Sequence, residues 1–177
     1  MDPLYFHFKH PTTIQVSGPT RCDKTRLVRR ILEEKLIQPF ATPIIWVFSE
    51  WQSDYDMVPD RYPGIEFEKE WRDKIFDSLS PEQRNILVQD DQMGVASSRT
   101  SVADLFTKGS PHRNLTVIYL VQYVYNQGKS QRSISLNSHY SVVFRNNRDA
   151  SQFRTMAYQI CPNNGKWLYW FFYGCHL

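Results

Sequence analysis

Residues 14–25 read IQVSGPTRCDKT. The β-branched residues at the start of this stretch predict the end of a buried strand, residues 18–25 a tight loop, and residues 26–37 the helix that follows. This is the layout of a phosphate-binding P-loop, in which backbone N–H groups and a helix N-terminus surround a phosphate while a lysine and a hydroxyl complete the site. Lys24 and Thr25 supply that lysine and that hydroxyl.

One position of the loop departs from the P-loop pattern. The pattern has a glycine, four free positions and then Gly-Lys-Ser/Thr, whereas Asp23 stands in place of the second glycine. An aspartate there adds a Cβ and a negative charge where the backbone must approach the phosphates closely. The candidate nucleotide-binding residues are those of the whole loop: Gly18, Pro19, Thr20, Arg21, Cys22, Asp23, Lys24 and Thr25.

Composition describes one ordinary globular domain. The chain has 177 residues, of which 41% are hydrophobic and 15% aromatic, so a disordered chain is excluded. Its formal net charge of +3 is too small to indicate nucleic-acid binding without a local basic cluster. Three scattered cysteines favour a reducing compartment, and the sequence contains neither a signal-peptide pattern nor an apolar run of ~20 residues. We therefore expect an intracellular protein, nuclear or cytoplasmic, that is not secreted and does not contact a membrane.

Five short apolar runs alternate with helical patterns, as in βαβ units on a parallel sheet. The predicted fold class is α/β, a mainly parallel five-stranded sheet between helices, to which residues 65–67 can add a short strand. The five runs are residues 13–16, 43–48, 86–89, 115–121 and 140–144. The residues expected in the core between two helical layers are Ile14, Ile45, Leu87, Ile118 and Val143.

Two acids, Asp90 and Asp91, close the run NILVQDD at residues 85–91. Open α/β sheets bind ligands at the C-terminal edge, where these carboxylates are expected. In a P-loop NTPase the first acid holds Mg²⁺ near the loop hydroxyl, here Thr25, and the second orients or deprotonates the attacking water. An isolated pair would more often include a helix cap. Together with Lys24 and Thr25 upstream, the catalytic interpretation is favoured.

Gln122 directly follows the apolar run at residues 115–121. A polar side chain at the end of a central strand can hydrogen-bond the γ-phosphate or the nucleophilic water. On spacing alone, a glutamine that satisfies loop backbone groups is an equal alternative.

Over roughly residues 8–164 the sequence resembles the FtsK/HerA-type genome-packaging ATPases of Polinton/Maverick elements and related adintovirus-like DNA viruses, and several strings carry the resemblance. These strings are SGPTRCDKT, IIWVFSEWQSDYD, NILVQDDQM, LFTKGSPHRNLTVIYLVQ and SLNSHYSVVFRNNRDASQ. The resemblance implies an additional-strand P-loop fold of the RecA/FtsK-like type with sheet order 5-1-4-3-2. It also implies that Gln122 lies between Lys24 and Asp90.

The resemblance further implies an activity and partners. Such ATPases hydrolyse ATP with Mg²⁺ and work as homo-oligomeric rings that pump double-stranded DNA into a capsid at its portal or vertex. A neighbour's arginine completes each ATP site in these rings. Arg113 and Arg132 are the candidates for that arginine in this chain.

The C-terminal segment departs from the family. Members continue beyond the last helix with further strands, whereas residues 167–173 are seven consecutive large apolar or aromatic residues. We therefore expect a C-terminally truncated P-loop ATPase domain at residues 1–164 and a divergent aromatic tail at residues 165–177.

Three functions are compatible with these features. The first is an ATP-driven DNA-packaging motor of a virus or virus-like transposon, impaired by Asp23. The second is a degenerate P-loop protein that keeps only the fold and contacts to DNA or other subunits. The third, a small-molecule kinase or GTPase, is disfavoured because the chain has neither an NKxD string nor an arginine-rich lid.

Overall fold

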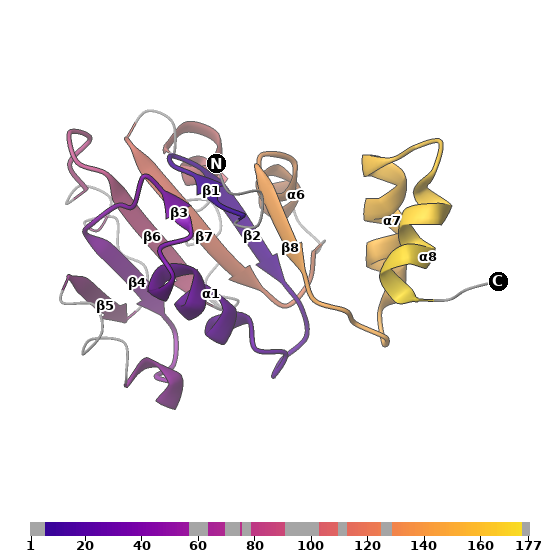
Figure 1. Cartoon of the computed structure of the whole chain (residues 1–177), viewed down its shortest axis with the longest axis horizontal. Coiled ribbons are helices and arrows are strands. Elements are labelled where there is room, and N and C mark those ends of the chain that lie inside the picture. The colour runs from indigo at the N-terminus through magenta and orange to yellow at the C-terminus, as the bar shows by residue number, and fades with distance from the viewer. Residues whose placement is uncertain are drawn as a thin grey trace.

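A six-stranded parallel sheet forms the centre of the molecule (Figure 1). The computed structural model describes residues 6–56, 64–69, 75, 79–90, 103–109, 113–124 and 129–174. The strand order is β5-β4-β6-β7-β2-β8. The strands are β2 (Thr13–Ser17), β4 (Ile44–Phe48), β5 (Ile65–Lys69), β6 (Asn85–Asp90), β7 (Leu115–Val121) and β8 (Tyr140–Val143). A separate parallel pair joins β1 (Phe8–Lys9) to β3 (Ile37–Gln38).

The predicted topology is confirmed. β7 lies between β2 and β6, as the order 5-1-4-3-2 requires, and every pairing in the sheet is parallel. A sixth strand, β5, extends the edge beyond β4. The four inner strands β2, β4, β6 and β7 are buried along their whole length, because continuous apolar runs suit a sheet that is covered on both faces.

The hydrophobic core lies on both faces of the sheet, so the sheet divides it into separate clusters. Alternate side chains of a strand point to opposite faces, so Ile14 and Ile118 pack on the face of helix α1 (Lys24–Glu33). Ile45 and Leu87 pack on the other face, with the π-helical turn η2 (Leu105–Gly109) and helix α6 (Lys129–Leu136).

Helix α1 has the amphipathic pattern expected of a helix on a sheet. Its inward residues Val28, Ile31 and Leu32 are buried, while Arg30 and Glu34 form an ion pair of 2.8 Å on the outer face. Burial of this apolar stripe fixes the helix, and therefore the position of Lys24 at its start.

Helices α7 (Ala150–Ile160) and α8 (Gly165–Tyr173) form a hairpin beside the β8 edge (Figure 1). The hairpin joins the sheet through an apolar cluster that includes Val124 and Val143. Residues 165–173 are thus a helix packed on α7, and the boundary at residue 164 stays a prediction. In the part of the chain that the structure describes, no helix is long and apolar enough to cross a bilayer.

Candidate functional site

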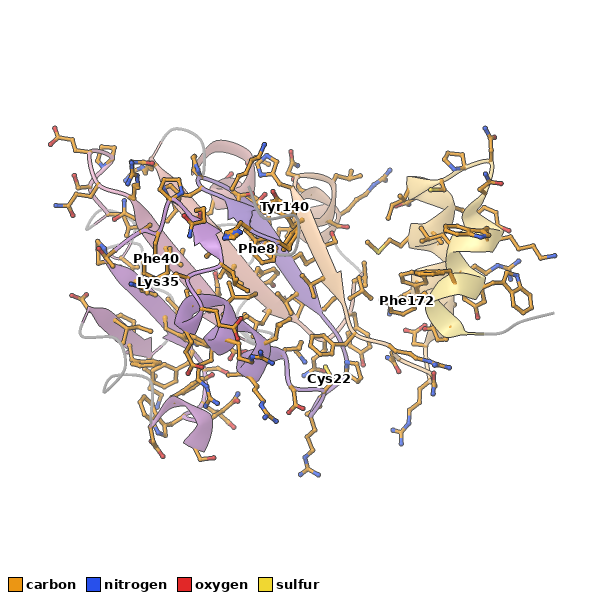
Figure 2. All side chains as sticks on the ribbon, in the orientation of Figure 1. Phe8, Cys22, Lys35, Phe40, Tyr140 and Phe172 are labelled. Atoms are coloured by element: carbon orange, nitrogen blue, oxygen red, sulfur yellow. The ribbon has the colours of Figure 1, made fainter. Side chains whose placement is uncertain are left out.

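The loop of residues 18–23 leaves β2 at its C-terminal end and enters α1 at Lys24. The backbone N–H of Gly18 donates to the carbonyl oxygen of Val121 on β7, at 3.1 Å. A Cβ at Gly18 would lie 2.5 Å from Phe144 Cβ and 2.7 Å from Cys22 Sγ. Only glycine therefore lets the loop turn this tightly over the end of the sheet, where Cys22 is seen in Figure 2.

We expect Gly18→Ala to lower the free energy of unfolding by about 1–3 kcal/mol, because the added methyl group overpacks the loop against Phe144. Urea unfolding measures this change. Gly64→Ala is the matched control, since no atom of the described residues lies within 4 Å of a Cβ there and Gly64 has no positive φ. Equal effects of the two substitutions would contradict the packing role of Gly18.

The backbone of the loop alternates in handedness. Arg21 and Asp23 have φ angles of 63° and 65°, whereas Cys22 between them is not in the left-handed region. Such alternation turns successive N–H groups toward one concavity, which is the anion-binding arrangement of P-loops. Positive φ favours glycine, and aspartate tolerates it better than most residues. Asp23 therefore replaces glycine at a position whose positive φ favours glycine. Arg21 has a positive φ as well, although the P-loop sequence pattern does not require glycine there.

The Lys24 ammonium is held inside the loop. Its Nζ donates to the carbonyl oxygens of Gly18 at 2.8 Å and Pro19 at 3.0 Å, and lies 3.9 Å from Cys22 Sγ. Burial raises the pKa of the Cys22 thiol, although the charge of Lys24 opposes this shift. The thiol is therefore neutral near pH 7, so Asp23 and not Cys22 is the loop residue that adds negative charge.

Two hydroxyl groups converge on Asp90 at the end of β6. Thr25 Oγ1 donates to Asp90 Oδ2 at 3.0 Å, and the Tyr55 hydroxyl donates to the same oxygen at 2.7 Å. Asp90 is only 3% exposed. The pairing of Thr25 with Asp90 is the one that the strand ends predicted, and their roles toward Mg²⁺ stay predictions.

Tyr55 is a site residue that sequence reasoning missed. It belongs to the 3₁₀ turn η1 (Ser53–Tyr55) after β4, and its ring packs 5.4 Å from Trp46 and 5.5 Å from Phe67 between ring centroids. This aromatic packing anchors the loop and aims the hydroxyl at Asp90. The only signal in the sequence was a cluster of aromatic residues after a strand, which indicates a packed loop but not its polar contact.

Tyr55→Phe should lower the free energy of unfolding by about 1.5 kcal/mol, because it removes one buried hydrogen bond to Asp90 without creating a large cavity. Thermal or urea unfolding checks this value. Tyr123→Phe, at an exposed tyrosine, is the control and should change stability little. A loss no larger at Tyr55 than at Tyr123 would mean that the contact with Asp90 contributes nothing to stability.

Lys24, Thr25 and Asp90 line one open cavity of about 380 Å³, a size that suits a small-molecule ligand. Its lining residues are Thr20, Arg21, Cys22, Asp23, Lys24, Thr25, Gln52 and Asp90. A carboxylate oxygen and a hydroxyl oxygen side by side are the hard ligands that Mg²⁺ prefers. Among the described residues no group of three His, Cys, Asp or Glu could hold a metal ion by itself, so Mg²⁺ here would need water or phosphate oxygens as further ligands.

Comparisons with known proteins find similarity in structure and not in sequence. No family model matches the chain, and no curated protein sequence matches it. The cytoplasmic domain of EssC is similar with a TM-score of 0.57 and 9% identity, over 82% of this chain and 35% of that one. The KaiC-like protein PH0186 from Pyrococcus horikoshii OT3 is similar with a TM-score of 0.52 and 15% identity, over 77% and 72% of the two chains. The chain has a RecA/FtsK-like α/β fold built on a parallel sheet.

These likenesses support the fold and no finer assignment. Identities of 9% and 15% are too low to carry substrates or partners from one protein to another. The chain also spans only about a third of the EssC chain, since it covers 35% of it. The resemblance to Polinton and adintovirus-like packaging ATPases is not addressed by either structure.

Gln122 does not line the cavity that Lys24, Thr25 and Asp90 line. β7 ends at Val121, in register with Ser17, so Gln122 lies level with Gly18. There it lines a separate small cavity of about 20 Å³ beside the start of the hairpin. The strand that Gln122 follows, β7, does lie between β2 and β6 as predicted, but Gln122 does not line the cavity of Lys24 and Asp90. A catalytic role for Gln122 stays a prediction.

The remaining predicted residues of the P-loop ATPase site are placed as follows. Asp91 lies outside the described residues. Arg113 precedes β7 and therefore lies at the N-terminal ends of the strands, whereas the loop lies at their C-terminal ends. Arg132 is exposed on α6. Neither arginine lines the cavity of Lys24. A residue that acts on the site of a neighbouring subunit does not have to lie in the cavity of its own chain.

Proposed function

We propose that the chain is an ATP-binding motor ATPase that moves double-stranded DNA for packaging in a virus or virus-like transposon, with its ATP site weakened by Asp23. The observation that carries the proposal is the convergence of Lys24, Thr25 and Asp90 on one cavity. A lysine ammonium, a hydroxyl and a carboxylate at the end of a parallel sheet suit a nucleotide phosphate with its Mg²⁺. DNA packaging itself is supported by the sequence resemblance alone.

The chain's own residues divide the work of binding a nucleotide. Lys24 supplies the point charge that faces the phosphates once it exchanges its two loop carbonyl partners for phosphate oxygens. Thr25 and Asp90 are the residues that would hold Mg²⁺, and Tyr55 keeps the Asp90 carboxylate oriented. Mg²⁺, when bound, neutralises the charge that develops on the transferred phosphoryl group.

A homo-oligomeric ring would complete the proposed site. An arginine from a neighbouring subunit stabilises phosphoryl-transfer charge in many P-loop enzymes. Arg132 suits this role because it is exposed on α6, and Arg113 is the alternative. The capsid portal or vertex, and an intracellular location, follow from the same proposal.

A degenerate P-loop protein is the second candidate, and the conformation of the loop favours it. Asp23 has a φ of 65° and an exposed carboxylate at the mouth of the cavity, and Lys24 is already bonded to loop carbonyl groups. In that case the fold would serve contacts to DNA or to other subunits without ATP turnover.

Calorimetric titration of the chain with Mg-ATP separates these candidates. The proposed motor binds Mg-ATP in a manner that Lys24→Ala abolishes, and it hydrolyses ATP faster when duplex DNA is added. Weak binding without hydrolysis, or no binding at all, with or without DNA, would contradict the motor and support the degenerate protein.

A further inference from the structure

The segment of residues 145–174, which holds the α7–α8 hairpin and the turn before it, carries the net positive charge of the chain. Residues 145–174 contain four basic residues and one acidic residue, a net charge of +3, which equals the formal net charge of all 177 residues. The rest of the chain is therefore neutral overall. The charged residues of this segment are Arg145, Arg148 and Asp149 before α7, and Arg154 and Lys166 on the two helices. The small net charge of the whole chain therefore conceals a local excess of positive charge in this segment.

Two of these cations line a cavity of about 220 Å³ between the two helices. The cavity is lined by Arg154, Tyr158, Lys166, Tyr169 and Trp170. Arg154 and Tyr158 are four residues apart on α7, as are Lys166 and Trp170 on α8. Each helix therefore presents a cation and an aromatic ring on one face. The lining therefore combines two positive charges with three aromatic rings.

Close packing at the start of α8 creates this arrangement. A Cβ at Gly165 would lie 2.6 Å from Tyr158 Cγ and 2.7 Å from Tyr158 Cα, so only glycine allows the helices to approach here. Lys166 is thereby brought next to Tyr158, and its Nζ lies 5.9 Å from the centroid of the Trp170 ring. An ammonium over a tryptophan face combines a charge and a stacking surface in one place.

The cations are free to meet an external anion. Among the residues that the structure describes, neither Arg154 nor Lys166 has a carboxylate partner. The aromatic surface continues outside the cavity, where the Trp167 and Phe171 rings stack at 5.4 Å and are 64% and 74% exposed. A contiguous exposed aromatic surface beside two cations favours a binding surface.

We propose that the cavity between α7 and α8 binds single-stranded nucleic acid. An unpaired base would stack on Tyr158 and Trp170, while Arg154 and Lys166 would hold the adjoining phosphates. This is the combination of ring faces and basic residues with which proteins bind single strands. At 220 Å³ the cavity is smaller than the ~300–1,000 Å³ of pockets for drug-sized ligands, and so suits one base of a longer strand.

Two other occupants fit the cavity less well. In a duplex the base faces are stacked on one another, so only the phosphates could reach Arg154 and Lys166, and the rings would have no role. A bilayer surface would favour a convex apolar face with cations at its border, whereas here the cations line the concavity itself. The inference concerns the hairpin alone and does not depend on nucleotide binding at the P-loop.

Fluorescence anisotropy of a labelled oligothymidylate, titrated with the full chain, tests the proposal. We expect Trp170→Ala and Lys166→Ala each to weaken binding roughly fivefold or more. Lys69→Ala on β5, at the opposite edge of the sheet, removes the same charge and should leave affinity unchanged. Arg154→Ala and Lys166→Ala change exposed side chains, so they keep the test valid if Trp170→Ala does not fold.

Three results would overturn the proposal. The first is binding of a duplex of the same length as tightly as the single strand, since that would indicate attraction to phosphates only. The second is binding that Lys69→Ala weakens as much as Lys166→Ala does. The third is displacement of the oligonucleotide by vesicles of anionic lipid together with loss of vesicle binding on Phe171→Ala, which would assign the surface to a membrane.

Discussion

Replacing Asp23 by glycine is expected to tighten the binding of Mg-ATP at least tenfold. Asp23 is exposed at the mouth of the cavity that Lys24, Thr25 and Asp90 line. Two like unit charges 4 Å apart repel by about 1 kcal/mol in bulk water and about 4 kcal/mol at an effective dielectric constant of 20. A tenfold change in affinity needs about 1.4 kcal/mol, which lies inside this interval.

The backbone at Asp23 adds a second reason for the effect. With a φ of 65°, residue 23 is in the left-handed region that glycine occupies without steric cost. Without a Cβ, the chain could also bring its N–H group nearer to the phosphates. Asp23→Gly therefore acts through both the charge and the closeness of approach.

Two further variants distinguish these contributions in the calorimetric titration. Asp23→Asn removes the charge and keeps a residue that tolerates positive φ, so it should recover most of the gain if electrostatics dominates. Lys24→Ala in the Asp23→Gly background should abolish the gain, because the ammonium is the main charge opposing the phosphates. An unchanged affinity for Asp23→Gly would show that the weakness of the site has a cause outside the loop.

The sheet could be predicted from sequence because its strands are continuous apolar runs between helical patterns. The run LTVIYLV is short, continuously apolar apart from Thr116, and rich in β-branched and aromatic residues, which favours a strand buried on both faces, as β7 is. The pairing of Thr25 with Asp90 followed from the same logic, since parallel strands present their C-terminal ends at one edge.

Contacts that depend on exact register or on loop packing could not be predicted. Gln122 follows a central strand, but β7 ends level with Ser17, and one residue of register decides which cavity the side chain lines. Tyr55 reaches Asp90 only because its ring packs among Trp46 and Phe67, from two other strands. Such contacts arise in the folded chain and have no local pattern.

The helical structure of the aromatic run at residues 167–173 could not be predicted from its sequence pattern either. It was expected to be a divergent tail because it departs from the family that the sequence resembles, and without alternation or charge it offers no helix or strand periodicity to suggest otherwise. In the structure it is the body of α8, because Phe172 and Tyr173 have a partner surface on α7. Figure 2 labels Phe172 on this hairpin, where its ring stacks on Phe153 at 3.9 Å between centroids.

Phe153→Ala is expected to lower the free energy of unfolding by about 3–5 kcal/mol, the usual cost of removing a buried phenylalanine. Phe153 is buried and stacks on Phe172 in the cluster that joins the hairpin to Val124 and Val143 of the sheet side. Because that cluster connects the hairpin to the sheet, the loss should appear in the single unfolding transition of the whole chain. Urea unfolding followed by circular dichroism and by tryptophan fluorescence measures it.

Phe171→Ala on the same helix is the matched control. Its ring is 74% exposed, so removing it should change stability by no more than about 0.5 kcal/mol. The hydroxyl of Tyr173 donates to the carbonyl oxygen of Asn146 at 3.1 Å, which gives the hairpin a polar attachment besides the apolar cluster. If Phe153→Ala instead splits unfolding into two transitions and leaves the main one in place, the hairpin folds as a unit of its own and the sheet does not need it.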